Sequence, residues 1–175
     1  MKKLIVYFHG YGSSPKSDKV ARLRQEPDFN VHAFNIDIDP VFAEKHLTHW
    51  INMCLVDNIH LPEKLVFVGT SLGGWWAKKM AKQYKCKAVI INPSVDPANS
   101  LIKYGIAEEV LSGYHLLAPY IGDKYFFAEH DEVIDNVEFR NNLIDSGYDV
   151  TVVKNADHRF GGDAFEKVVS YLKTL

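Results

Sequence analysis

The chain has 175 residues, 47% of them hydrophobic and 24% charged, which is typical of one folded domain and argues against a disordered protein. Its net charge of −2 gives no indication of a nucleic-acid-binding surface. Two cysteines, Cys54 and Cys86, form neither a disulfide framework nor a metal-ligand spacing, and the apolar run Leu4–Phe8 is too short for a secretory signal or a membrane span. We therefore expect a cytoplasmic protein without a membrane-spanning segment.

Six short apolar runs rich in β-branched residues predict strands, and most are continuously apolar, as in strands covered on both faces. They are Leu4–Phe8, Val31–Ile36, Leu65–Val68, Ala88–Ile91, Tyr125–Ala128 and Asp149–Val153. Helical patterns lie between them, from Ser17 or Asp18 to Arg24, from Pro40 to Leu55, and over Leu72–Tyr84, Val133–Ser146 and Phe165–Leu175. The alternation predicts a single α/β domain, residues 1–175, with a mostly parallel sheet of about six strands and helices on both faces.

One connection, residues 94–120, interrupts this alternation. It is too long for a plain loop and carries many large apolar side chains. We expect a helical excursion that forms a small cap over one end of the sheet. A crossover helix with long flanking segments is the alternative.

Polar residues follow four of the predicted strands. After the first, third, fifth and sixth strands come "HGYGSSPKS", "GTSLGG", "EHDEVID" and "NADHRFGG". Ligands of an open parallel sheet bind outside the carboxyl ends of its strands. A serine, several carboxylates and a histidine therefore meet at one edge of the sheet, and these are the residue types that nucleophilic catalysis by serine requires.

The segment Gly69-Thr70-Ser71-Leu72-Gly73 matches the G-x-S-x-G nucleophile elbow. In this motif a strained strand-to-helix turn holds the serine Oγ clear of the sheet, and the glycines remove side chains that would clash. The predicted strand before the motif and the helix after it supply the required context. Ser71 is the predicted nucleophile, and a glycine-rich turn with an unreactive serine is the alternative.

A serine hydroxyl needs a base to accept its proton. Only His115, His130 and His158 follow the serine, and His158 alone leaves a carboxylate-bearing strand end between serine and base, which is the chain order of this fold class. His158 is therefore the predicted base. A second histidine group shows no evident carboxylate partner, and there we expect an exposed helix face and no metal site; it consists of His46, His49 and His60.

The acid of such a triad holds the imidazole in the correct tautomer and stabilises the imidazolium. The candidates after the fifth strand are Glu129, Asp131, Glu132 and Asp135. Asp131 lies just beyond the strand end, whereas Glu129 is expected in the strand and Asp135 in the following helix. Asp131 is the predicted acid, and Asp135 is the next candidate.

The tetrahedral intermediate needs N–H donors for its oxyanion. The Leu72 N–H, at the start of a helix, is one predicted donor, and the Tyr11 N–H, in the loop after the first strand, is the other. In the same loop we expect Gly10 to allow a close approach and His9 to shape the pocket. A plain buried histidine at a strand end explains His9 equally well.

These motifs, in this order, resemble those of the α/β-hydrolase superfamily, and the "HGYGSSPKS" loop and the short chain resemble the small bacterial YqiA-like esterases. The resemblance spans Tyr7 to about Gly162. It implies hydrolysis of a carboxylester or thioester through Ser71, His158 and the intervening acid, without a metal or organic cofactor. The sequence departs from the family pattern at Trp75 and Trp76, which follow the elbow. Trp75 either lines the substrate pocket or packs with its neighbour beneath nearby helices.

The sequence therefore predicts a serine esterase or thioesterase acting on small to medium acyl groups. Four cations near the first loop favour an anionic substrate such as an acyl-CoA or form a solvated helix face; they are Lys16, Lys19, Arg22 and Arg24. A non-catalytic binding module with the same fold is the alternative function. A serine peptidase is less favoured, because the chain has no room for the large cap that admits peptides. The oligomeric state is left open.

Overall fold

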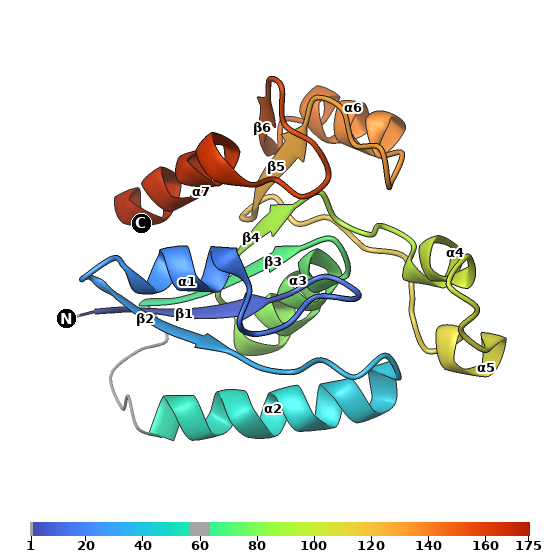
Figure 1. The fold of residues 1–175 in the computed structure, drawn as a ribbon, viewed down its shortest axis with the longest axis horizontal. Coiled ribbons are helices and arrows are strands. Elements are labelled where there is room, and N and C mark those ends of the chain that lie inside the picture. The colour runs from blue at the N-terminus through green and yellow to red at the C-terminus, as the bar shows by residue number, and fades with distance from the viewer. Residues whose placement is uncertain (1, 57–63) are drawn as a thin grey trace.

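The computed structural model describes residues 2–56 and 64–175. Within these residues, strands form at all six predicted places: β1 (Lys3–Phe8), β2 (Phe29–Ala33), β3 (Leu65–Thr70), β4 (Lys87–Ile91), β5 (Lys124–Ala128) and β6 (Asp149–Val153). They make one sheet of order β2-β1-β3-β4-β5-β6, and every neighbouring pair is parallel (Figure 1). The predicted α/β class is confirmed.

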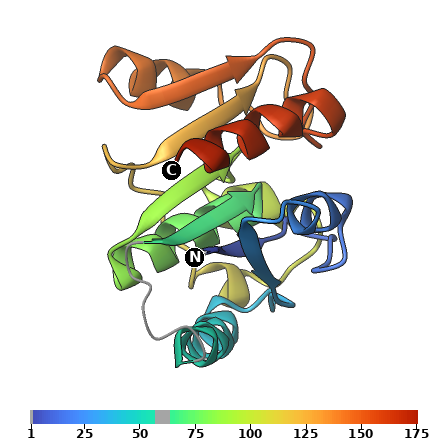
Figure 2. The same ribbon diagram turned by 90° about the vertical axis from the view of Figure 1, so that its left-hand side faces the viewer.

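Helices cover both faces of this sheet. They are α1 (Asp18–Arg24), α2 (Pro40–Val56), α3 (Leu72–Tyr84), α4 (Pro97–Ile102), α5 (Glu108–Leu111), α6 (Val137–Asp145) and α7 (Gly162–Thr174). Leu4, Val6 and Phe8 of β1 share a core with α2 and α3, whereas Ile5 and Tyr7 share one with α1 and α7. Figure 2 shows α1 and α7 on one side of the sheet and α3 and α6 on the other. None of the helices in the described ranges has the length and apolar character that crossing a bilayer requires.

Strand β2 is shorter than predicted, because it ends at Ala33 rather than at Ile36. Beyond this point the chain leaves the sheet and turns beneath α2. Phe34 stacks on Trp50 with ring centroids 5.8 Å apart, and Ile36 packs partly buried against the same core. The apolar run extends past the strand because Phe34 and Ile36 pack against the core on the side of α2. The end of the run therefore does not mark the end of the strand.

Helix α6 begins at Val137, four residues later than the predicted start at Val133. The Asp131 carboxylate accepts hydrogen bonds from the Val133 N–H at 3.0 Å and the Ile134 N–H at 2.9 Å. Asp135 then accepts one from the Val137 N–H at 3.1 Å. Aspartate side chains that bind nearby N–H groups compete with helix formation, and two such turns replace the expected first helical turn.

Residues 94–120 contain α4, α5 and irregular chain, and both short helices lie beyond the carboxyl ends of the strands (Figure 1). The segment is tied to its surroundings at several points. The Tyr114 hydroxyl donates to the Ile38 carbonyl at 2.9 Å, and the Lys103 ammonium donates to the Val133 carbonyl at 3.1 Å. The segment therefore has a fixed position above the edge of the sheet where the polar loops meet.

Candidate active site

Ser71 lies in a strained turn between β3 and α3. Its φ of 57° and ψ of −124° fall in a sparsely populated region for a residue with a side chain. Its N–H donates to the Ile91 carbonyl at 2.9 Å, and its carbonyl accepts from the Gly74 N–H at 2.9 Å and the Ser94 N–H at 3.1 Å. The end of β4 and the residues that follow it therefore hold the serine backbone on both sides.

The glycines beside Ser71 are required by close backbone packing. A Cβ atom on Gly69 would lie 1.9 Å from the Gly73 carbonyl oxygen, and one on Gly73 would lie 2.0 Å from the Phe8 carbonyl oxygen. Such distances are far inside van der Waals contact. The first turn of α3 thus packs directly against its own strand and against the end of β1, which explains both glycines of the motif.

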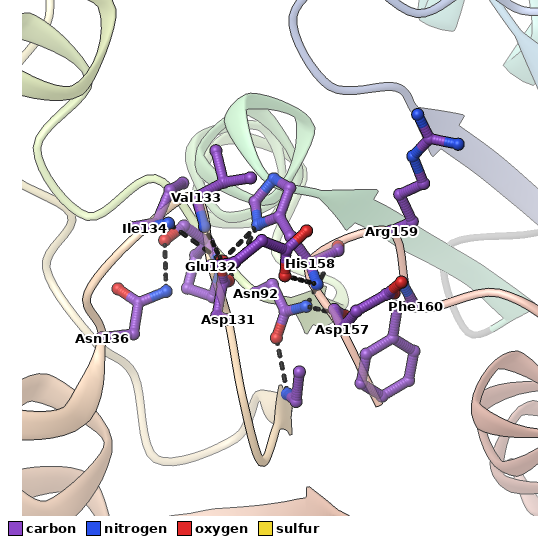
Figure 3. A network of polar contacts seen from close by, with 12 residues as sticks. Asn92, Asp131, Glu132, Val133, Ile134, Asn136, Asp157, His158, Arg159 and Phe160 are labelled. Carbon is purple, nitrogen blue, oxygen red and sulfur yellow. Dashed lines mark hydrogen bonds and ion pairs between the residues drawn. The ribbon is translucent and has the colours of Figure 1, made fainter. Parts of the chain in front are cut away.

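Asp131 and His158 meet in the loops that follow β5 and β6 (Figure 3). Both carboxylate oxygens lie 2.8 Å from His158 Nδ1. Burial raises the pKa of Asp131, but hydrogen bonds from His158, Ile134 and Val133 and the charge of the histidine outweigh burial, so the pKa is lowered below its usual value. An ionised carboxylate only accepts hydrogen bonds, so Nδ1 carries a proton, and in the neutral imidazole Nε2 is the acceptor.

Ser71 and His158 line one cavity of about 870 Å³ at the carboxyl ends of the strands. Gly10, Tyr11 and Leu72 line it as well. Apolar side chains form part of its wall: Leu101, Val133, Ile134 and Phe165. Asp131 lies outside the lining and contacts the cavity through His158. The structure therefore brings five of the residues predicted from sequence to one concave surface.

The loop after β1 passes close to the serine. A Cβ atom on Gly10 would lie 3.2 Å from Ser71 Cβ and 3.7 Å from Ser71 Oγ. The next residue, Tyr11, packs its ring on Tyr104, with centroids 4.6 Å apart. On the other side, Leu72 begins α3, and the N–H groups of a first helical turn have no partner within the helix. Gly10, Tyr11 and Leu72 thus lie at the same end of the cavity as Ser71.

His9 and Trp75 do not line the cavity. The His9 ring is buried, its Nδ1 lies 2.9 Å from the Gly10 carbonyl oxygen, and burial lowers its pKa although the Gly10 and Phe34 carbonyls oppose this. Trp75 is buried as well: its Nε1 donates to the His115 carbonyl at 2.7 Å, and its ring packs edge-on against Tyr114. The idea that Trp75 narrows the pocket does not fit this geometry, because the indole packs beneath residues 94–120.

Lys19 and Arg22, two of the four cations considered for an anionic substrate, line this cavity and also bind neighbouring protein groups. Arg22 binds Glu166 through two nitrogens, at 2.5 and 2.8 Å, and lies 2.7 Å from Glu26. The Lys19 ammonium donates to the Arg159 carbonyl. These contacts join α1 to α7 and to the loop of His158, so both side chains have structural partners.

Within the described ranges no three His, Cys, Asp or Glu side chains gather as a metal-ligand cluster, and His60 lies outside those ranges. Glu132, one of the four candidate acids, accepts from the His158 N–H at 3.0 Å and not from the ring. Sequence reasoning missed Asn92, whose side chain binds the same loop (Figure 3). Asn92 is the first residue after β4, a strand end that the search for polar loops left out.

The sheet order, the elbow and the cavity at the strand ends define the α/β-hydrolase fold, and comparison with solved structures agrees. An alpha/beta superfamily protein of Xanthomonas campestris has a TM-score of 0.70 and 16% identity, covering 99% of this chain and 100% of that one. S-formylglutathione hydrolase of Staphylococcus aureus has a TM-score of 0.69 and 15% identity, covering 98% and 84%. An esterase of Pyrococcus furiosus has a TM-score of 0.63 and 18% identity, covering 99% and 81%.

The chain belongs to the family described as "Uncharacterised protein family (UPF0227)", whose model matches residues 4–117. A UPF0227 protein of Vibrio parahaemolyticus is 25% identical over 185 residues, which cover 98% of this chain and 97% of that protein. One of Shewanella loihica is 28% identical over 102 residues, covering 57% and 55%. The predicted resemblance to the α/β-hydrolase superfamily and its small YqiA-like members is confirmed. The matched residues include Ser71 and end before Asp131 and His158.

Proposed function

We propose that this protein is a serine hydrolase that cleaves small to medium acyl esters or thioesters through an acyl-enzyme. One observation carries the proposal: His158, paired with Asp131, lines the same cavity as a serine held in a strained elbow. The activities named for several structures of the same fold, an esterase and a thioester-cleaving hydrolase among them, agree with this chemistry.

In the proposed reaction, Ser71 Oγ attacks the carbonyl carbon of the substrate while His158 Nε2 accepts the hydroxyl proton. Asp131 holds the imidazole through Nδ1 and stabilises the imidazolium. The proton then passes to the departing alkoxide or thiolate, and the acyl group stays on the serine. Water, deprotonated by His158, attacks this ester, and the acid leaves as Ser71 regains its proton.

The oxyanion of each tetrahedral intermediate is proposed to accept hydrogen bonds from the Leu72 and Tyr11 N–H groups. The position of Leu72 at the start of α3 and the close passage of Gly10 beside Ser71 support this assignment. Donors aimed at the developing charge are among the largest contributions to such catalysis, and removing one costs roughly 10²–10³ in kcat.

Residues 94–120 are proposed to act as a cap within the single domain. Leu101, Lys103 and Tyr104 contribute to the wall of the cavity, and the segment is tied down through Tyr114. A cavity of about 870 Å³ with a partly apolar wall suits an acyl group of modest length.

A fluorophosphonate probe followed by peptide mass spectrometry tests the nucleophile. We expect covalent labelling at Ser71 that disappears in Ser71→Ala and His158→Ala and persists in Ser146→Ala, an exposed serine at the end of α6. An unlabelled wild-type protein, under conditions that label a reference hydrolase, would favour the binding module instead. p-Nitrophenyl esters of increasing chain length, with acyl-CoA thioesters alongside, then define the substrate class.

A further inference from the structure

We propose that Asn92 is a positioning residue that fixes the distance between Ser71 and His158 by holding the backbone of the histidine loop. The inference rests on the proposed function, because it concerns the base of that reaction. Asn92 follows β4 directly and its side chain is fully buried.

The Asn92 side chain uses both of its ends (Figure 3). Its oxygen accepts from the Ala128 N–H at 2.7 Å, at the end of β5. Its nitrogen donates to two successive carbonyls of the histidine loop, Asp157 at 3.2 Å and His158 at 3.1 Å. An amide side chain whose oxygen and nitrogen are both hydrogen-bonded costs little free energy to bury, and its hydrogen bonds restrict the positions of its partners.

The same short segment also holds the nucleophile. The Ile91 carbonyl accepts from the Ser71 N–H, and the Ser94 N–H donates to the Ser71 carbonyl. Asn92 therefore lies between two residues that bind the serine backbone, while its own side chain binds the histidine backbone. Nucleophile and base come from different strands, and the end of β4 is the element that contacts both.

His158 is held from the opposite side by Glu132, which accepts from its N–H, and by Asp131, which binds its ring. Without the Asn92 contact, the carbonyl side of the loop would lose its link to the sheet edge. The residue type is also suited to the backbone, since φ of Asn92 is +41° and asparagine tolerates this left-handed region better than most residues.

A purely structural role predicts a different result from a positioning role. As a structural residue, Asn92 would join β4 to β5 and its loss would lower stability alone. Asp123 provides the matched control, because it joins the opposite ends of the same strands: its carboxylate accepts from the Ala88 N–H at 3.1 Å and pairs with Lys78 at 3.1 Å. Asp123 lies outside the cavity of Ser71.

The test compares kcat and KM for a p-nitrophenyl ester in wild type, Asn92→Gly and Asp123→Asn. Glycine keeps the positive φ while removing the side chain. We expect Asn92→Gly to lower kcat roughly ten- to hundredfold with KM changed less than about threefold, because small misplacements of a base reduce rate rather than binding. Asp123→Asn should lower the melting temperature and leave kcat within about twofold.

A double-mutant cycle identifies the path of the effect. If Asn92 acts through His158, Asn92→Gly should have no further effect on the residual kcat of His158→Ala. Should Asn92→Gly fail to fold, Asn92→Asp replaces it; that side chain can still accept from Ala128, but its carboxylate faces the two loop carbonyls without a donor, so the same loss of kcat is expected.

The outcomes separate this inference from the proposed function. An active wild type with an equally active Asn92 variant, or an equal loss in the His158→Ala background, would overturn the positioning role and leave the hydrolase intact. A wild-type protein that neither hydrolyses the esters nor reacts at Ser71 would overturn the proposed function, and the positioning role of Asn92 with it.

Discussion

At the scale of single residues, Asp131 performs two tasks with one carboxylate. It accepts from the Val133 and Ile134 N–H groups, which fixes the turn after β5, and it accepts from His158 Nδ1. The turn therefore fixes the position of the carboxylate that binds the histidine. Asp135, four residues further along the chain, makes a similar turn, in which its carboxylate accepts from the Val137 N–H. The two aspartates thus form a natural pair for comparison.

Replacing Asp131 by asparagine should lower kcat by roughly 10³–10⁴ with little change in KM, because an amide beside Nδ1 favours the wrong tautomer of His158. The matched variant Asp135→Asn should stay within about threefold of wild type. Steady-state hydrolysis of one p-nitrophenyl ester measures kcat and KM for both variants. A large loss in Asp135→Asn with an active Asp131→Asn would assign the acid to the other aspartate.

The lowered pKa of Asp131 also predicts how stability depends on pH. A carboxylate whose pKa is lower in the folded than in the unfolded chain stabilises the fold fully above its unfolded pKa of about 3.9, and this stabilisation is lost as pH falls through the folded value. The difference in melting temperature between wild type and Asp131→Asn should therefore be largest near neutral pH and shrink below about pH 4. Calorimetry across this range checks it, and a difference independent of pH would contradict it.

At the scale of elements, the elbow was predictable because its glycines are required by close backbone contacts that any such turn makes. Gly73 shows the constraint most clearly, since a methyl group there would meet the Phe8 carbonyl rather than a movable side chain. The boundaries of β2 and α6 were less predictable. Phe34 is apolar because it packs under α2, and Asp131 and Asp135 take the amides that a helix would otherwise use. The end of β2 thus depends on a tertiary neighbour, whereas the start of α6 depends on local side-chain contacts that apolar periodicity does not reveal.

Gly73→Ala should destabilise the protein by at least about 2 kcal/mol, because α3 or β1 must shift to admit the methyl group. Gly161→Ala is the control: its φ is −91° and a Cβ there would meet nothing within 4 Å, so its cost should stay below about 1 kcal/mol. Urea unfolding measures both free energies. Equal costs for the two variants would show that the close approach of α3 to β1 relaxes easily.

At the scale of the whole molecule, the parallel sheet explains why so much of the candidate site was predictable. All strands point the same way, so any polar residue after a strand lies at one edge, and Ser71, Asp131 and His158 follow from that rule. The pocket wall was not predictable, because it depends on how residues 94–120 fold back. That path buries Trp75 beneath Tyr114 and brings Tyr104 to the cavity instead.

If residues 94–120 act as the proposed cap, a substitution in their wall of the cavity should shift substrate preference. Tyr104→Ala should raise kcat/KM for long-chain esters relative to short ones, because the ring that packs on Tyr11 at the cavity wall is removed. Tyr120→Ala, an exposed tyrosine outside this cavity, should leave the ratio unchanged. The ratio of kcat/KM for an octanoate to that for an acetate ester is the readout. An unchanged ratio in Tyr104→Ala would mean that residues near 104 do not limit chain length.

The order of the strands has a further consequence, for how the chain folds. Strand β1 is the first to be made, yet its sheet partners come much later, since Lys3 pairs with Phe29 and Leu4 with Leu65. Such long-range parallel pairing requires large loops to close before the pairing itself stabilises the chain, and it slows folding to roughly milliseconds or longer. During that time the apolar edge of β1 stays unpaired, and association with other chains competes with folding.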